Sequence, residues 1–234
     1  MTPKEFTHAA RPQVFAGKNF NKIFCIGANK TGTTTLEAVL KLYGYNLPSQ
    51  TEQEIRISQS AFSTDYTDFS NFVRQYDAFQ DLPFSQGLIY VAADALFPNS
   101  KFILSERTPE SWFNSVKTFF EKEYQIDDLS KITKSDFVEK FDYLHRGYAY
   151  AYKSKMLTTF RNSQKEIKWD KLFDKDYYIS LYEERNDQIK QYFSNVPEKL
   201  LIIDVTKEID TEKICDFLNI PKIFVFKMPH LNKT

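Results

Sequence analysis

The sequence predicts an α/β fold with three layers, in which helices flank a central parallel sheet of about four to five strands. Short apolar runs over residues 22–26, 101–106 and 200–205 are typical of strands that are buried on both faces of a parallel sheet. Segments with helical periodicity alternate with these runs, as they do in chains that fold into parallel sheets. A glycine-containing loop, GANKTG, connects the first run directly to a predicted helix.

The first half of the chain is predicted to hold one clear strand–loop–helix unit followed by shorter elements. A helix over residues 33–43 places Leu36, Val39 and Leu40 on one face, and Gly44 is a natural end for it. The other elements expected before residue 100 are a strand around 45–47, helices over 52–59 and 65–76, a strand over 77–81 and a helix over 85–97 closed by Pro98.

The second half of the chain is predicted to be mainly helical. Pro109 is expected in the first turn of a helix, where proline is tolerated. The elements expected after it are helical stretches over 134–160 and 174–194, a helix over 210–218 capped by Thr211 or Asp210, and an irregular tail over 220–234. We interpret the chain as a single domain, 1–234, with an N-terminal arm at 1–20 and a helical insertion at about 120–195.

Composition excludes several classes of protein. The chain has 234 residues, a formal net charge of +0, 42% hydrophobic and 26% charged residues, which predicts a globular protein without a nucleic-acid or membrane partner. No apolar run approaches the roughly 18 residues that span a bilayer, and no apolar segment near the N-terminus resembles a secretory signal. Cys25 and Cys215 lie in apolar runs and are expected to be buried free thiols, so the expected location is the cytoplasm.

Histidines and aromatic residues give weaker indications. His8, His145 and His230 are scattered and form no metal-ligand spacing, so no metal is predicted. The chain has 22 Phe and 14 Tyr, many of them between residues 119 and 193. This favours an aromatic helical core and leaves open an acceptor pocket lined partly by rings.

The loop over residues 27–35 has the properties of an anion site. The backbone N–H groups at the start of a helix are aligned donors that carry a partial positive charge. Gly32 permits a backbone conformation that other residues avoid, and Thr33, Thr34 and Thr35 add hydroxyl donors beside it. A phosphate group would fit such a loop, and the predicted fold is in this sense P-loop-like. The alternative is a tight strand-to-helix turn without a ligand.

The loop differs from that of nucleotide-hydrolysing enzymes at one residue. Gly27 and Gly32 have the spacing of the G-x-x-x-x-G-K-[ST] pattern, but Thr33 occupies the lysine position and Lys30 lies inside the loop. A lysine after the second glycine contacts the β- and γ-phosphates in those enzymes, and the next hydroxyl contacts magnesium. The position of Lys30 therefore indicates a different phosphate-bearing ligand.

A second candidate anion site follows the strand predicted at 101–106. Arg107 comes directly after this strand, and Ser115 lies eight residues later in the next helix. Both could bind one anion at the carboxyl edge of the sheet, where open α/β sheets bind their ligands. The alternative is that Arg107 pairs with Glu106 or Glu110 and that Ser115 is an ordinary helix residue.

These motifs resemble those of PAPS-dependent sulfotransferases. NKTGTT is similar to their 5′-phosphosulfate loop, and RTPESWFNS matches their strand–Arg–(seven residues)–Ser pattern and the RxPxxW form of bacterial-type members. The resemblance implies that Lys30 reaches the phosphosulfate bridge and that Arg107 and Ser115 bind the 3′-phosphate. The residues that it implies for the rest of the donor are Asn29, Thr31, Gly32, Thr33, Thr34 and Thr35. Thr35 stands where many cytosolic members have a tryptophan that stacks on adenine.

The resemblance extends from about residue 22 to the end of the chain. The C-terminal half contributes the segments YEERNDQIKQYF, LLIIDVT, KICDFLNIP and PHLNK. Arg185, within the first of them, stands where the bacterial-type subfamily often has histidine.

A candidate base lies in the segment AFQDLPFS. Cytosolic sulfotransferases have a catalytic histidine in a similar His-Leu-Pro setting, and Asp81 occupies the equivalent position here. Asp81 is therefore the first candidate base, and Lys30 and Asp81 are the predicted catalytic residues. The alternatives for Asp81 are capping of a helix near Ser85 or orientation of Lys30 by an ion pair. His145 is a second candidate base.

The leading hypothesis is a metal-independent sulfotransferase that moves a sulfuryl group from PAPS to a hydroxyl or amine of a small-molecule or glycan acceptor. One alternative is a P-loop small-molecule kinase or NTPase, which would need a lysine after Gly32 and a magnesium ligand. Another is a non-catalytic nucleotide-binding protein. Magnesium-independent binding of adenosine 3′,5′-bisphosphate distinguishes the first hypothesis from the second.

Overall fold

The computed structural model describes residues 19–141, 143–144, 147–229 and 231. It divides the chain into two compact units, here called the first unit (Met1–Arg107 and Arg185–Lys233) and the second unit (Thr108–Glu184 with Thr234). Most of the arm predicted at 1–20 lies outside the described residues. The single domain with a helical insertion stays a prediction.

The first unit is built on a four-stranded sheet with the order β2-β1-β3-β6. All three strand pairs are parallel, and Phe24 in β1 lies opposite Phe79 in β2 and Phe102 in β3. The strands are β1 (Ile23–Cys25), β2 (Ala78–Phe79), β3 (Lys101–Ser105) and β6 (Leu200–Ile203). The predicted α/β fold with a central parallel sheet is therefore confirmed.

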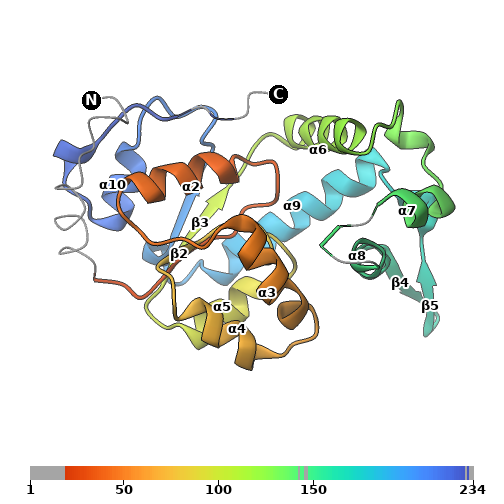
Figure 1. Cartoon of the computed structure of the whole chain (residues 1–234), viewed down its shortest axis with the longest axis horizontal. Coiled ribbons are helices and arrows are strands. Elements are labelled where there is room, and N and C mark those ends of the chain that lie inside the picture. Colours follow the sequence, from red (N-terminus) through yellow and green to blue (C-terminus); the bar gives the residue numbers. More distant parts are fainter. Residues whose placement is uncertain (1–18, 142, 145–146, 230, 232–234) are drawn as a thin grey trace. The chain divides into compact units, whose positions relative to one another are not determined.

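Helices cover both faces of this sheet (Figure 1). Alternation along β1 explains the two layers, since Ile23 and Cys25 belong to one buried cluster while Phe24 and Ile26 belong to the other. The first cluster includes residues of α2 (Thr33–Leu42) and α10 (Glu212–Leu218). The second includes residues of α3 (Gln50–Phe62), α4 (Tyr66–Val73), α5 (Ile89–Leu96) and the end of α9 (Lys175–Tyr192).

The end of α2 follows the sequence prediction. Gly44 has φ +90° and donates its N–H to the Lys41 carbonyl at 3.0 Å, and the Tyr45 N–H bonds to the Leu40 carbonyl at 3.1 Å. This pair of bonds is a Schellman motif, which needs a residue that adopts the left-handed conformation without strain.

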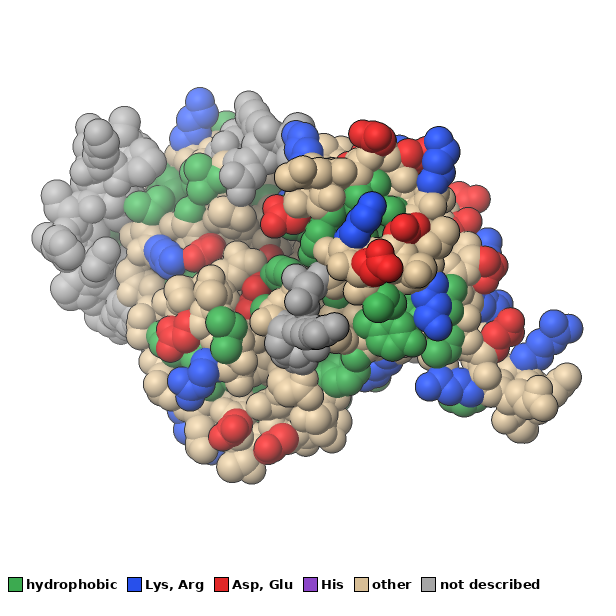
Figure 2. All heavy atoms as spheres, turned by 45° about the vertical axis from the view of Figure 1, so that its right-hand side comes forward, with side chains coloured by type: hydrophobic (Ala, Val, Ile, Leu, Met, Phe, Trp, Pro, Cys, Tyr) green, Lys and Arg blue, Asp and Glu red, His purple; other side chains and the backbone are tan. Residues whose placement is uncertain are grey.

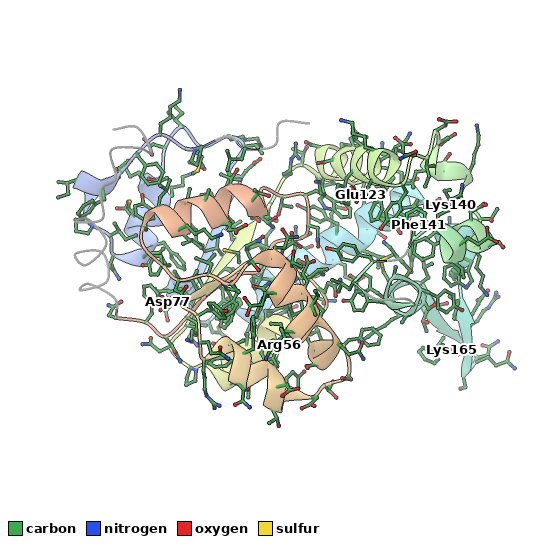
Figure 3. The ribbon with its side chains drawn as sticks, in the orientation of Figure 1. Arg56, Asp77, Glu123, Lys140, Phe141 and Lys165 are labelled. Carbon is green, nitrogen blue, oxygen red and sulfur yellow. The ribbon has the colours of Figure 1, made fainter. Side chains whose placement is uncertain are left out.

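The strand predicted around residues 45–47 is wrong. The Asn46 carbonyl accepts from the N–H groups of Asp77 at 2.8 Å and Ala78 at 3.3 Å, and the Asn46 N–H donates to the Asp77 carboxylate at 3.0 Å, but no ladder forms (Asp77 is labelled in Figure 3). Pro48 lacks an N–H group, so a ladder cannot continue past Leu47.

The long helix predicted over residues 134–160 is also wrong. The structure has α7 (Lys134–Lys140) and α8 (Tyr148–Met156), followed by an antiparallel hairpin of β4 (Thr158–Arg161) and β5 (Gln164–Ile167). Asn162 and Ser163 form the two-residue turn with φ of 50° and 62°, the conformation of a type I′ turn. The β-branched pair Thr158 and Thr159 favours the strand over the helix.

The second unit has an aromatic core. Phe141, labelled in Figure 3, lies 4.1 Å from the Tyr124 ring and 5.8 Å from the Phe173 ring, measured between ring centroids. Lys153 donates to the Tyr178 hydroxyl at 3.0 Å within this core, and burial lowers its pKa to about 7. The unit begins with α6 (Pro109–Glu123), in which Pro109 occupies the first turn as predicted and Thr108 caps the helix.

The described surface is mixed in charge. On the face drawn in Figure 2, acidic and basic side chains alternate without a broad area of one sign. In the described parts of the chain, no helix is long and apolar enough to cross a membrane. Cys25 and Cys215 are both buried free thiols, as expected.

A buried hydroxyl joins α2 to the C-terminal part of the first unit, and we expect it to contribute to stability. The Tyr43 hydroxyl lies 2.5 Å from the Thr211 hydroxyl and 3.0 Å from the Cys215 sulfur. Tyr43→Phe should lower the free energy of unfolding by about 1–2 kcal/mol, because it removes hydrogen bonds from a dry site. Urea denaturation measures this change.

Tyr66→Phe is the matched control, since no hydrogen bond of the Tyr66 hydroxyl to the described residues is found. An equal effect of the two substitutions would contradict the role of the Tyr43 hydroxyl.

Candidate active site

Gly27 begins the loop between β1 and α2, and its lack of a side chain is required by packing. A Cβ atom built on Gly27 would lie 2.5 Å from the Ser105 carbonyl oxygen and 2.8 Å from the Ser105 nitrogen. Because both atoms belong to the backbone of β3, neither can move without disturbing the sheet. The loop therefore leaves β1 in close contact with the end of the neighbouring strand.

Two residues in the left-handed conformation direct the chain from the loop into helix α2. Lys30 has φ +70° and Gly32 has φ +94°. A Cβ atom on Gly32 would lie 2.2 Å from Cγ2 of Val205, which follows β6. Helix α2 begins at Thr33, and the Gly32 carbonyl accepts the Leu36 N–H at 3.1 Å. The predicted strand–loop–helix connection is thus observed.

The threonine hydroxyls of the loop have different surroundings. Thr31 is fully buried, and its hydroxyl donates to the Ala28 carbonyl at 2.6 Å and lies 2.6 Å from the Ser105 hydroxyl. Thr33 donates to a carboxylate oxygen of Asp81 at 3.2 Å. Thr35 is buried, whereas Thr34 is exposed at the start of α2. Thr31 and Thr33 therefore hold the loop together, and Thr34 lies where a ligand can reach it.

Asp81 follows β2 and binds the loop that follows β1. Its Oδ1 accepts from the Asn29 side-chain amide and, at 2.9 Å, from the Leu82 N–H, while its Oδ2 accepts from Thr33. Asp81 itself has φ +61°, a conformation that non-glycine residues adopt rarely. The residue predicted as a base thus lies against the loop predicted as an anion site.

The environment of Asp81 raises its pKa to about 6. Burial is the main cause, because it penalises the charged form, and the negative charge of Glu54 adds to it. The hydrogen bonds from Thr33 and the Leu82 N–H and the charge of Lys30 oppose this rise. Asp81 therefore titrates close to neutral pH.

One alternative for Asp81 is contradicted by the structure. The next helix along the chain, α5, begins at Ile89 and has Leu88 as its N-cap, so the Asp81 side chain does not cap it. The other alternative, orientation of Lys30, agrees with the mutual influence of the two charges.

Arg107 and Lys30 meet at the same edge of the sheet. Nη1 of Arg107, two residues past the end of β3, donates to the Lys30 carbonyl oxygen at 3.3 Å. Burial lowers the pKa of Lys30, the charge of Asp81 raises it and the charge of Arg107 lowers it further. The carboxyl ends of β1, β2 and β3 thus bring together Lys30, Asp81 and Arg107.

The two carboxylates named as alternative partners of Arg107 are engaged elsewhere. Glu106 forms an ion pair with Lys190 at 2.7 Å and accepts from Asn186 at 3.2 Å. Glu110 forms an ion pair with Lys175 at 2.5 Å within the second unit. Both carboxylates therefore have partners other than Arg107 among the contacts found.

Several predicted residues lie apart from this group or outside the described chain. Ser115 is a buried residue of α6, in the second unit, and its role stays a prediction from its spacing to Arg107. Trp112 of the same motif stacks on Tyr182, with ring centroids 4.3 Å apart. His145, the second candidate base, and His230 of the PHLNK segment lie outside the described residues.

Three polar residues of the site were not predicted from the sequence. Gln53 and Glu54 lie in α3 and are only 2% and 5% exposed. Gln53 donates to the backbone carbonyls of Gln80 and Leu82, on either side of Asp81. Arg185 was noted only as a departure from a family pattern. The polar segment QTEQEI is typical of an exposed helix face and gave no signal of this burial.

Comparison with known families agrees with this geometry. A family model described as a sulfotransferase domain matches residues 22–234. The chain belongs to the sulfotransferase family. No curated protein matches the chain. The family resemblance inferred from the loop and from Arg107 is therefore confirmed, and the chain is a transferase domain of this family.

The two loop glycines lead to a prediction about stability. Gly27→Ala should lower the free energy of unfolding by about 2–4 kcal/mol, because the new methyl group overlaps backbone atoms of Ser105. Gly32→Ala should be destabilising for two reasons, the overlap with Val205 and the left-handed φ, which costs an L-residue about 1–2 kcal/mol. Chemical denaturation of each variant measures both effects.

Double variants separate the two causes. Val205→Ala should relieve part of the cost of Gly32→Ala, so that the double variant is more stable than the sum of the single changes predicts. Ser105→Ala should leave Gly27→Ala strongly destabilised, because the carbonyl oxygen and nitrogen of Ser105 remain. Full rescue of Gly27→Ala by Ser105→Ala would contradict the backbone origin of the constraint.

Proposed function

We propose that this sulfotransferase domain moves a sulfuryl group from PAPS to a hydroxyl or amine of a small-molecule or glycan acceptor. The proposal rests on one observation. Asn29 and Thr33 donate hydrogen bonds to the Asp81 carboxylate and so connect it to the loop that contains Lys30. These bonds support a single site in which the Lys30 ammonium stabilises the leaving group and the Asp81 carboxylate takes the proton of the acceptor.

The donor side is assigned to the loop and the start of α2. Aligned N–H groups at the helix start and the exposed hydroxyl of Thr34 suit the 5′-phosphate. The Lys30 ammonium suits the bridging oxygen, where negative charge develops as the sulfur–oxygen bond breaks. Thr31 and Thr35 are buried, so we assign their side chains to support of the loop rather than to direct contact.

The chemistry balances without a metal. The bond between sulfur and the bridging oxygen breaks, and a new bond forms between sulfur and the acceptor oxygen or nitrogen. The acceptor proton passes to Asp81, and adenosine 3′,5′-bisphosphate leaves with the electron pair of the broken bond. Lys30 stabilises the charge of that leaving group electrostatically.

Asp81 has the properties of a general base. Its Oδ1 accepts two hydrogen bonds, from Asn29 and Leu82, whereas Oδ2 accepts one, from Thr33. A carboxylate oxygen accepts two bonds, so Oδ2 has capacity for the acceptor hydroxyl. A pKa of about 6 suits a base that works near neutral pH better than the usual value of an exposed aspartate.

Arg107 is assigned to the 3′-phosphate of the donor. It lies beside Lys30 at the carboxyl edge of the sheet, and its planar guanidinium suits phosphate oxygens. Ser115 is its proposed companion on the basis of sequence spacing. We place the reaction in the cytoplasm, where free thiols such as Cys25 and Cys215 stay reduced, and we expect no nucleic-acid partner.

Replacement of Asp81 tests the base and its energetic cost together. Asp81→Asn should lower turnover about 10²-fold or more, because the amide cannot take a proton. The same change should raise the free energy of unfolding at pH 8 by up to about 3 kcal/mol. At that pH the buried carboxylate is ionised, and its raised pKa of about 6 means that ionisation in the folded protein is unfavourable. Sulfate transfer from labelled PAPS to phenols, sugars and amines, and urea denaturation, measure the two effects.

The pH dependence of these effects has a definite sign. The raised pKa of Asp81 means that its contribution to stability is fully present below pH of about 4 and is lost as pH rises to about 6. The stability advantage of Asp81→Asn should therefore appear across this interval, while wild-type turnover falls below pH of about 6. Asp187→Asn, at an exposed position of α9, is the control. Near-normal turnover of Asp81→Asn would exclude Asp81 as the base.

Nucleotide selectivity tests the 3′-phosphate assignment. Arg107→Ala should weaken binding of adenosine 3′,5′-bisphosphate about 10–100-fold more than binding of adenosine 5′-monophosphate, because only the first carries the 3′-phosphate. Calorimetry in the presence of a metal chelator measures both affinities, with Arg74→Ala as the control. An unchanged ratio of the two affinities would exclude the assignment, and binding that requires magnesium would favour the kinase alternative.

A further inference from the structure

We propose that Arg185 is a positioning residue, whose guanidinium connects the end of β1 to the loop that carries Asp81 and so fixes the base relative to the Lys30 loop. The catalytic part of this inference rests on the proposed function. The structural part, a connection between two segments of the first unit, does not depend on it.

The guanidinium of Arg185 bonds to three backbone carbonyl groups. Nη1 donates to Ile26 at 2.8 Å, Nη2 to Phe84 at 3.1 Å and Nε to Gly87 at 3.3 Å. Ile26 immediately precedes the loop glycine Gly27, and Phe84 lies three residues after Asp81. One rigid side chain thus links the starting point of the Lys30 loop to the segment that follows the candidate base.

The segment over residues 80–88 needs such external donors. It runs between β2 and α5 without a strand partner, and buried carbonyl groups require hydrogen bonds. Gln53 supplies them to the two neighbours of Asp81, through the carbonyls of Gln80 and Leu82. Arg185 supplies them farther along the segment, at the carbonyls of Phe84 and Gly87. The backbone that holds Asp81 in its left-handed conformation is therefore fixed both beside Asp81 and beyond it.

Packing fixes the same segment from within the core. Phe84 is fully buried, and its ring lies 5.0 Å from the Phe24 ring of β1 and 5.1 Å from the Phe79 ring of β2. The ring sets the depth of the segment in the core, and the bond from Arg185 to the Phe84 carbonyl sets its backbone orientation.

Arg185 is itself held on a rigid element. The next residue, Asn186, donates to Glu106 at 3.2 Å, and Lys190 pairs with the same carboxylate at 2.7 Å. Ile189 of the same helix is fully buried. This part of α9 is therefore anchored at the end of β3. The backbone of Arg185 is held in place, and its side chain extends from there to the two segments that it joins.

The role of Arg185 is geometric more than electrostatic. The largest influences on the pKa of Asp81 are burial, Glu54, Thr33, the Leu82 N–H and Lys30, and Arg185 is not among them. The planar fork of arginine reaches three carbonyls at fixed angles, which the single ammonium of lysine cannot reproduce. Arg185→Lys, which keeps the charge, should therefore fail to restore function.

Local hydrogen exchange tests the structural part. In Arg185→Ala, amides of residues 24–32 and 79–88 should exchange about 10-fold faster or more, while amides of β6 and α10 keep wild-type rates. Arg74→Ala is the matched control, because this exposed arginine of the same unit donates only to Asn71 among the bonds found for its side chain. Should Arg185→Ala fail to fold, Arg185→Gln and Arg185→Lys are measured in the same way.

Kinetics test the catalytic part. Turnover of Arg185→Ala should fall about 10–100-fold, since a displacement of about 1 Å in a reacting group costs this much. Affinity for adenosine 3′,5′-bisphosphate should change less than about 3-fold, since the direct phosphate contacts remain. Guanidinium ion at non-denaturing concentration should restore part of the turnover, whereas methylammonium should not.

The outcomes are distinguishable. Unchanged exchange in both segments, or wild-type exchange and turnover in Arg185→Lys, would overturn the inference. Faster exchange everywhere, with no local excess in residues 24–32 and 79–88, would also overturn it by making Arg185 a residue of general stability. If exchange is locally faster in Arg185→Ala but the wild-type protein transfers no sulfate from PAPS, the structural connection is supported and the proposed function is rejected.

Discussion

The burial of the Asp81 carboxylate between two loops is the constraint on which the rest of the site depends. A charged group in such a place must be surrounded by donors, and Asn29, Thr33 and the Leu82 N–H provide them. Once these bonds form, the loops after β1 and β2 have a fixed mutual position. The raised pKa of Asp81 indicates that the arrangement weakens the folded state near neutral pH. Retention of a group that lowers stability is typical of a functional site.

The sheet explains why residues far apart in sequence can share this site. The order β2-β1-β3 makes three strands neighbours, and parallel strands end at the same edge. Close packing then shapes the loop, because Gly27 contacts the backbone of Ser105 and Gly32 contacts Val205. The glycine spacing that resembles a nucleotide-binding motif is therefore required by the sheet itself. The proposed donor site depends instead on what lies between the glycines, which here includes Lys30.

Signals that depend on neighbouring residues predicted the fold well, and those that depend on distant contacts did not. The apolar strands, Gly44, Pro109 and the glycine loop each carry a local physical requirement and were identified from the sequence. The strand at 45–47 was wrong because these residues form no ladder with the sheet, and the helix over 134–160 was wrong because Gly147, with φ +89°, precedes a separate helix α8 and Thr158 begins a strand that pairs with β5. Asp81 was predicted through its motif, and its role as the base stays a prediction. Gln53 and Arg185 were missed because their partners are carbonyl groups, which no sequence pattern displays.

The use of an aspartate at this position makes demands on the backbone that a histidine would not. An aspartate side chain is short, so the location of its carboxylate follows the backbone almost directly, whereas a longer side chain can adjust through its own torsions. The proposed base at Asp81 can be positioned accurately only if the backbone of residues 80–88 is positioned accurately. The left-handed φ of Asp81, the two bonds from Gln53 and the three bonds from Arg185 all act on that backbone. Under the proposed function, the two departures from the family pattern, Asp81 and Arg185, have one explanation, since a short base needs a rigid support.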